Sequence, residues 1–385
     1  MPTTVSAATI SPSVITDTPQ MATLRAEVRD FLTEEIAAGA FRPTPDSWLS
    51  RWDEDFSRKL AARGWLGMTI PTEYGGHGRT FLERFVVTEE LLAVGAPVAA
   101  HWIADRQIAP SLLRFGTEEQ KQAFLPRIAA GDMYWGIGMS EPDSGSDLAS
   151  VRTRGVPVEG GWRVTGTKVW TSGAHEADAF FALARTAPLD PQHRHQGLSQ
   201  FIVDLHSEGV EIRPIVSMNG EHHFNEVHLN EVFIPDNRVL GEIGSGWTGV
   251  TSELAYERSG PERYLSTFPV YAGLLDQARA ERASVDSRLG ATAGRLFGLH
   301  QMSRAVAGAL ERHEQADVAA SVVKVLGTLT EGDIAEDAHL ATIPGRDDEF
   351  DQLVHLALSH RPGFTLRGGT VEVLRGVIAR GLGLR

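Results

Sequence analysis

The sequence predicts an α+β multidomain protein with an N-terminal helical domain, a middle β-sandwich or barrel domain and a C-terminal helix bundle. Three observations predict this order. Apolar residues recur at helical spacing from Met21 to about Asp132, short apolar runs broken by Gly, Pro, Asp and Asn follow from Tyr134, and long stretches with few breakers return after Gly246. At 385 residues the chain is also too long for one ordinary core.

The N-terminal helical domain is predicted over residues 21–133, after a flexible tail of residues 1–20. The tail is rich in Ser, Thr and Pro and has no Lys or Arg, so it resembles neither a secretory signal nor a mitochondrial presequence. Within the domain, Thr117 and Gln120 have the spacing of a capping box, which predicts that a helix begins there.

The middle β domain is predicted over residues 134–245 and the C-terminal bundle over residues 246–385. Strand-like runs in the middle domain occupy residues 161–165, 179–183, 200–204 and 227–234. Turn residues separate these runs, which is typical of a sandwich or barrel. The bundle is predicted from two long helical stretches, residues 286–311 and 318–339.

Composition excludes several classes of protein. The net charge of −14 argues against a nucleic-acid-binding protein, which normally presents a basic face. The chain has no cysteine, so disulfides, thiolate catalysis and cysteine-ligated iron–sulfur clusters are excluded. No apolar run is long enough for a membrane span, and the histidines do not have the spacing of a zinc site. We therefore expect a cytoplasmic protein with no metal site and no membrane or nucleic-acid partner.

A loop of small residues follows the strand-like run of residues 134–139. Residues 140–147 read Ser-Glu-Pro-Asp-Ser-Gly-Ser-Asp, and such a loop exposes backbone amides and hydroxyls of the kind that a phosphate or a flavin edge requires. Taken alone, the loop is equally consistent with an ordinary turn. It matches neither the P-loop nor the dinucleotide fingerprint.

Several further motifs occur with this loop in one order along the chain. They are residues 60–78, residues 140–147 followed by 166–173, residues 224–236, and residues 365–380. Together they resemble the acyl-CoA dehydrogenase family over roughly residues 24–380. The resemblance implies the fold of that family, FAD as cofactor and an acyl-CoA substrate.

The resemblance also implies eight cofactor contacts. They are Met139 and Ser140 at the flavin ring, Gly145 and Ser146 beside the pyrophosphate or the substrate thioester, Trp170 over the ring, Ser172 near its polar edge, and Thr370 and Glu372 in the C-terminal signature. Without the surrounding motif, Trp170 would be interpreted as a core aromatic residue.

The family's catalytic base has two known positions, and this sequence departs from the commoner one. Gly368 stands where many members carry the catalytic glutamate, although its backbone N–H is still able to bond the thioester carbonyl. Glu257 falls where isovaleryl- and long-chain-type enzymes keep their base, and Arg258 is then expected to point toward coenzyme A. Without the resemblance, a Glu-Arg pair in a helix is a solvated surface feature and Gly368-Gly369 is a tight turn.

The expected reaction is the α,β-dehydrogenation of an acyl-CoA thioester. Glu257 removes the α-proton, the β-hydrogen leaves as hydride to flavin N5, and an electron-transfer flavoprotein reoxidises the flavin. Two alternatives stay open: a flavin monooxygenase or oxidase on the same scaffold, and a partner subunit of a hetero-oligomeric acyl-CoA dehydrogenase.

Two family segments that reach the FAD of a neighbouring subunit are missing. Neither Arg-x-x-Phe-Gly nor Gln-x-x-Gly-Gly occurs, and residues 287–289 and 340–345 are the nearest, poor matches. We expect a homodimer or homotetramer, with a hetero-oligomer as the alternative that this departure favours.

Overall fold

The computed structural model describes residues 15–280, 287–342 and 348–384, without the side chains of residues 253–257. The chain divides into two compact units. The helical unit comprises Met1–Arg51, Thr80–Pro97 and Ala255–Arg385, and the sheet unit comprises Trp52–Arg79 and Val98–Leu254. Neither unit is therefore one continuous stretch of sequence.

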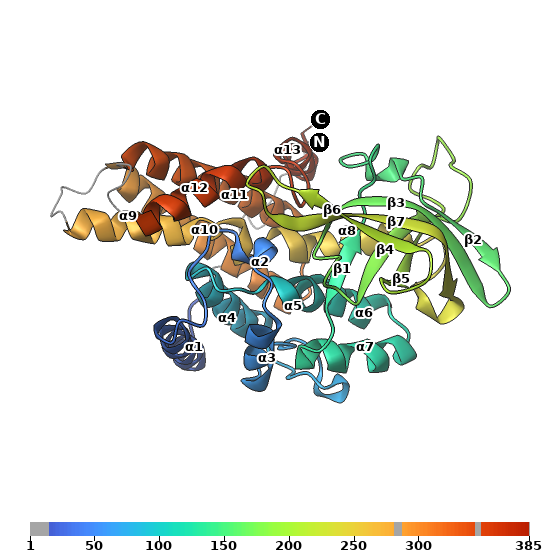
Figure 1. Ribbon diagram of the computed structural model, residues 1–385, viewed down its shortest axis with the longest axis horizontal. Helices are drawn as coiled ribbons and strands as arrows, with labels where there is room; N and C mark the ends of the chain where they lie inside the picture. Colours follow the sequence, from blue (N-terminus) through green and yellow to red (C-terminus); the bar gives the residue numbers. More distant parts are fainter. Residues whose placement is uncertain (1–14, 281–286, 343–347, 385) are drawn as a thin grey trace. The chain divides into compact units, whose positions relative to one another are not determined.

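The sheet unit is built on one sheet, which has eight strands within the described residues (Figure 1). The strand order is β6-β7-β3-β2-β4-β5-β8, and β1 also pairs with β4. The strands are β1 (Trp135–Gly138), β2 (Arg154–Val158), β3 (Gly161–Ser172), β4 (Ala179–Arg185), β5 (Leu198–Asp204), β6 (Val210–Val216), β7 (His222–Pro235) and β8 (Val239–Leu240). The four strand-like runs seen in the sequence lie in β3, β4, β5 and β7, so those predictions are confirmed.

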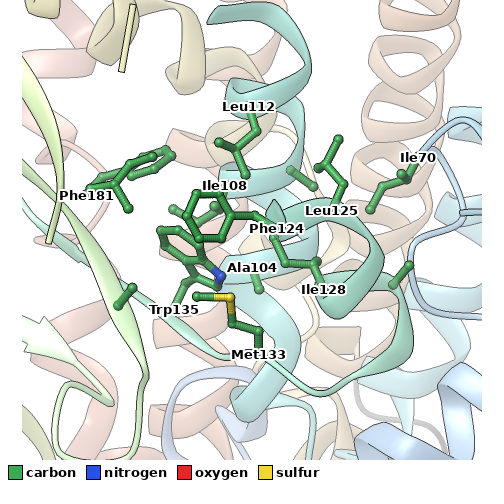
Figure 2. Close-up of a cluster of buried hydrophobic side chains, with 14 of the residues drawn as sticks. Ile70, Ala104, Ile108, Leu112, Phe124, Leu125, Ile128, Met133, Trp135 and Phe181 are labelled. Atoms are coloured by element: carbon green, nitrogen blue, oxygen red, sulfur yellow. The ribbon is translucent and has the colours of Figure 1, made fainter. Parts of the chain in front are cut away.

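Strand β4 lies in the interior because both of its faces are apolar. Phe181 packs with Trp135, whose ring also meets Phe124 of the helical layer, at centroid distances of 5.4 and 5.2 Å (Figure 2). The adjacent residue, Phe180, points to the opposite face, where it joins a second core cluster with Phe201. Alternation along a strand with two apolar faces thus gives the unit two cores on either side of one sheet.

Helices of the sheet unit pack on the Trp135 side of the sheet, and α3 packs in turn against α5 and α7. They are α3 (Glu54–Ala62), η2 (Thr72–Tyr74), α5 (Ala99–Ile103), η3 (Ala104–Ile108), α6 (Ala109–Phe115) and α7 (Glu118–Ala130), with the short 3-10 turns η4 (Leu148–Ser150) and η5 (Asp236–Arg238) between strands. The predicted capping box is confirmed: Thr117 caps α7, and the Gln120 side chain accepts in return from the Thr117 N–H.

The helical unit holds the remaining helices. They are α1 (Pro19–Ala37), α2 (Ser47–Ser50), α4 (Phe81–Ala93), η6 (Pro261–Arg263), α9 (Phe268–Ala280), α10 (Ser287–Glu311), α11 (Asp317–Ala341), α12 (Asp348–Phe364) and α13 (Val371–Gly381). The two long predicted helices correspond to α10 and α11. Helix α11 packs against α9, α10, α12 and α13, which makes it the central helix of this unit (Figure 1).

The family fold predicted from the sequence is confirmed, while the domain boundaries stay a prediction. Residues 1–14 of the predicted tail and residues 343–345 of the poor motif match lie outside the described residues. Helix α8 (Gly246–Arg258) crosses the division between the two units at Leu254 and ends before Pro261. Among the described residues, no helix is long and apolar enough to cross a membrane.

Candidate active site

Trp170 has an unusual backbone conformation for a bulky residue of a strand. Its backbone lies in the left-handed region, with φ 62°, which is rare for a bulky residue. The cause is a β-bulge: Lys168 pairs with Val227 and Thr171 with Asn225, so β3 has one residue more than β7 between these pairs. The bulge turns the indole outward, and 58% of the side chain is exposed.

The small-residue loop joins β3 directly beside this bulge. The backbone carbonyl of Ser140 accepts a hydrogen bond from the Val169 N–H at 2.9 Å, and Lys168 Nζ donates to the Met139 carbonyl at 3.2 Å. The structure therefore brings together Met139, Ser140 and Trp170, three of the cofactor contacts that the resemblance implies. Ser172 follows two residues later, half-buried, at the end of β3.

A buried ion pair holds this arrangement from behind. Lys168 is fully buried, and its Nζ lies 2.8 Å from Glu141 Oε1. Glu141 also accepts from the backbone N–H groups of Arg152 (2.6 Å) and Thr153 (2.9 Å). Burial lowers the pKa of Lys168 to about 8, although the charge of Glu141 opposes that shift. Breaking such a pair would leave an uncompensated buried charge, which is costly. The pair therefore holds Glu141, and with it the start of the loop, in place against β3.

The tip of the loop is open to solvent. Gly145 and Ser146 are exposed, and a Cβ built on Gly145 would have no atom within 4 Å. Ser144 anchors the turn, since its hydroxyl donates to the Asp147 carbonyl at 2.9 Å. A rigid base with a free tip is suited to contact a ligand through backbone and hydroxyl groups.

The sheet unit thus fits a flat aromatic cofactor. Trp170 presents an exposed aromatic face, and the Ser140 loop lies beside it. Thr171 Oγ1, next to Trp170, is buried with no hydrogen-bond partner in the part of the chain that the structure describes. Because the protein itself covers this atom completely, a ligand in contact with Trp170 has no access to it.

The helical unit brings together the other predicted residues. Gly368 and Gly369 both have left-handed backbones, with φ 68° and 83°. Arg258, the last residue of α8, is buried, and its Nη2 would lie 3.5 Å from a Cβ built on Gly369. The guanidinium of the last residue of α8 therefore reaches the Gly368-Gly369 turn. The Glu257 side chain lies outside the described residues, and only its place in α8 is known.

Thr370 and Glu372 lie at the start of α13. The Thr370 hydroxyl accepts from the Val373 N–H at 3.3 Å and caps the helix. Glu372 is exposed in the first turn, and hydrogen bonds from its own N–H and from Thr370 hold its pKa below the usual range. Their contact with a cofactor stays a prediction.

A buried charge cluster that the sequence did not predict lies behind the turn. Arg367 donates to both carboxylate oxygens of Asp46, at 2.5 and 2.6 Å, and His360 Nδ1 lies 3.0 Å from Asp46. Burial alone would raise the pKa of Asp46, but Arg367 and His360 outweigh it and the pKa lies below its usual range.

Glu331 of α11 is the second buried carboxyl in this region. Its Oε1 accepts from the Ser266 N–H at 2.8 Å, while Oε2 is buried with no hydrogen-bond partner among the described residues. Burial raises the pKa of Glu331 to about 7, although the charge of Arg367 opposes that shift. An unpaired buried oxygen is consistent with a carboxyl that keeps its proton.

Among the described residues, no group of three or more His, Asp or Glu side chains is arranged to hold a metal ion. His175 and His222 do stack, at 4.0 Å between ring centroids, but Asn225 bonds both rings and accounts for their arrangement.

Two family models match the chain: the acyl-CoA dehydrogenase N-terminal domain over residues 18–132, and the acyl-CoA dehydrogenase middle domain over residues 136–232. The chain is 35% identical over 381 residues to the acyl-CoA dehydrogenase IpdE1 of Mycobacterium tuberculosis, and the match covers 94% of this chain and 97% of that relative. It is 43% identical over 202 residues to the acyl-CoA dehydrogenase FadE34 of the same organism, covering 52% of this chain but 27% of FadE34's length.

A solved structure described as the Tcur3481-Tcur3483 steroid ACAD is also similar to this chain. The TM-score is 0.85 at 28% sequence identity, and the match covers 96% of this chain and 99% of the other. Both the sequence and the fold are thus shared over nearly the whole chain.

Proposed function

The chain belongs to the acyl-CoA dehydrogenase family of FAD-dependent enzymes, and from this premise we propose that Glu257 is the base of an acyl-CoA α,β-dehydrogenation. One observation carries the proposal. The Arg258 guanidinium reaches Gly369, and Glu257 is the preceding residue of α8, which supports a place for Glu257 near the Gly368-Gly369 turn. The base and the N–H that donates to the thioester carbonyl must lie close together, because the α-carbon is bonded directly to that carbonyl.

Each protein group then has a defined task. Glu257 accepts the α-proton, and the Gly368 N–H donates to the thioester oxygen, which stabilises the developing enolate. FAD, when bound, supplies the acceptor for the β-hydrogen. Trp170, Met139 and Ser140 would hold its ring. The tip of the loop at Gly145 and Ser146 would contact the pyrophosphate or the thioester.

Anaerobic mixing with acyl-CoAs tests the reaction. The FAD-loaded protein should lose its yellow colour with the correct thioester and form the 2-enoyl product. A panel of short, branched, long-chain and steroid-derived acyl-CoAs would identify the acyl group. We propose a steroid-derived group, which the description of the Tcur3481-Tcur3483 steroid ACAD supports.

Two alternative functions give different results in the same assay. A monooxygenase would not bleach with acyl-CoA in the absence of oxygen. An oxidase would bleach, but oxygen would then rapidly restore the yellow colour with release of hydrogen peroxide. A non-catalytic partner subunit would stay colourless after FAD addition. The partner alternative is favoured by the missing adenine-side motifs and by the two component names of the steroid ACAD. Transfer of electrons from the reduced enzyme to an electron-transfer flavoprotein would establish that flavoprotein as the electron acceptor.

A further inference from the structure

The turn between α12 and α13 has a backbone that glycine adopts far more readily than other residues. Gly368 and Gly369 are both left-handed, and the Val371 N–H closes the turn by donating to the Thr365 carbonyl at 3.1 Å. The Gly368 N–H lies in the plane of the peptide that joins Arg367 to Gly368, so contacts that fix this turn also fix the direction of the donor.

Lys324 of α11 holds both sides of this turn. Its side chain is fully buried, and Nζ donates to the Gly369 carbonyl at 2.8 Å and to the Thr365 carbonyl at 3.4 Å. These two carbonyls flank Gly368 in the chain. A single buried cation therefore restrains the peptide groups on both sides of the N–H that the reaction uses.

Arg367 restrains the turn through the residue next to Gly368. Its guanidinium bonds Asp46 through two nitrogens and lies over the rings of Trp48 and Phe364, at 4.6 and 5.1 Å from their centroids. A planar fork with two bonds and two aromatic neighbours leaves little freedom of rotation. Asp46 is itself buried and bonded to His360, so the acceptor is equally immobile.

We propose that Lys324 and Arg367 are positioning residues that aim the Gly368 N–H at the thioester carbonyl. The inference rests on the proposed function, which gives Gly368 that role. A donor to a developing oxyanion is effective when it is held in place before the reaction begins. Here the buried Lys324 of α11 and the partly buried Arg367 of the turn itself provide that rigidity, in a site that lacks a glutamate at position 368.

The test compares two ligands that differ in the carbonyl. The 2-enoyl-CoA product keeps the thioester carbonyl and is not dehydrogenated, whereas the matching S-alkyl-CoA thioether has a methylene in its place. Calorimetric titration of the FAD-loaded protein gives the ratio of the two Kd values. Lys324→Met and Arg367→Lys should each reduce the preference for the thioester roughly three- to tenfold, about the worth of one hydrogen bond. Thioether binding should stay unchanged, and kcat should fall more than KM rises.

Arg295→Met is the matched control, since Arg295 is a half-exposed cation that pairs with Asp333 between helices of the same unit. It should keep the wild-type ratio. If Lys324→Met does not fold, the ratio of Kd values measured for Arg367→Lys tests the inference alone, because this variant keeps the positive charge. Equal weakening of both ligands, or no change in the ratio, would overturn the inference while leaving the function intact. A wild-type protein with no preference for the thioester would remove the role of Gly368 and the inference with it.

Discussion

Trp170 meets Phe224 edge to face, with ring centroids 5.6 Å apart, while the backbone of Trp170 is left-handed and most of its ring faces solvent. A strained residue that buries little surface adds little to the stability of the chain. Strain of this kind persists where the surrounding structure enforces it, and it is concentrated at functional sites. The β-bulge enforces it here, and the exposed indole face is the feature that a bound ring would cover.

Replacing Trp170 separates strain from cofactor binding. Trp170→Gly should be more stable than Trp170→Ala by about 1 kcal/mol, because glycine adopts the left-handed backbone without penalty. Both variants should bind FAD more weakly than the wild type. Thermal unfolding without FAD checks the first expectation, and titration with FAD checks the second.

Phe233→Ala serves as control, because Phe233 is another exposed aromatic residue of the same sheet, on β7. It should leave FAD affinity unchanged. Unaltered FAD binding by both Trp170 variants would show that the indole does not cover the cofactor.

Glu331 predicts a pH dependence of stability. Its pKa is about 7 in the folded protein against 4.5 ordinarily, so folding takes up a proton between these values. Its contribution to stability is fully present below about pH 4.5 and is lost as the pH rises through 7. Glu331→Gln cannot ionise and still accepts from the Ser266 N–H. The stability difference between variant and wild type should therefore grow in the variant's favour by on the order of a few kcal/mol from pH 4.5 to 8.

Denaturant unfolding of both proteins at several pH values measures this difference. Asp46 does not interfere, because its pKa is lowered and its contribution is lost only as the pH falls below its ordinary value of 3.8. A difference that stays constant between pH 4.5 and 8 would mean that Glu331 is ionised in the folded protein.

Local patterns were sufficient to predict much of the fold. The capping box at Thr117 and Gln120 involves residues three apart, so the sequence displays it directly. Alternating apolar and polar residues, bounded by turn residues, likewise predicted four of the strands. The scarcity of helix-breaking residues predicted α10 and α11. The motif resemblance predicted the family. The sequence did not decide between sandwich and barrel, because strand pairing joins segments that are distant in the chain.

The buried polar groups could not be predicted from local pattern. Asp46 and Arg367 are 321 residues apart, and nothing near either residue points to the other. Lys324 lies in a helix, where a lysine is normally interpreted as solvent-exposed. The left-handed backbone of Trp170 arises from pairing with β7, so the sequence alone favoured a core aromatic residue. The structure thus added the supports of the candidate site, while its contact residues came from the resemblance.

Gly368→Glu should not create a second catalytic base. The left-handed backbone disfavours any side chain, so the variant should lose about 1–2 kcal/mol of stability. A carboxylate placed near Glu257 would also raise the pKa of that base. Gly363→Glu is a matched control, because Gly363 lies in α12 with open space around it. Turnover and thermal unfolding of both variants check this; a gain of activity in Gly368→Glu would contradict a single base at Glu257.

Glu257→Gln tests the proposed base directly. Glutamine keeps the size and hydrogen-bonding capacity of the side chain but cannot accept the α-proton. The rate of flavin bleaching by acyl-CoA should fall by about 10²–10⁴-fold, the usual contribution of a general base. FAD binding should survive, because the residues proposed to hold the cofactor are elsewhere. The variant should therefore stay yellow, bind acyl-CoA and fail to bleach under anaerobic conditions.

A surface position for Glu257 leads to the opposite expectation. An exposed glutamate tolerates glutamine with stability changes within about 0.5 kcal/mol, and bleaching would then stay within about twofold of the wild-type rate. Stability and FAD affinity measured on the same preparation exclude a folding defect as the cause of lost activity. If bleaching is normal, Glu257 is not the base, and Glu253, one helical turn earlier in α8, becomes the next carboxylate to replace. Loss of bleaching in Glu257→Gln together with normal bleaching in Glu253→Gln would assign proton removal to Glu257 alone.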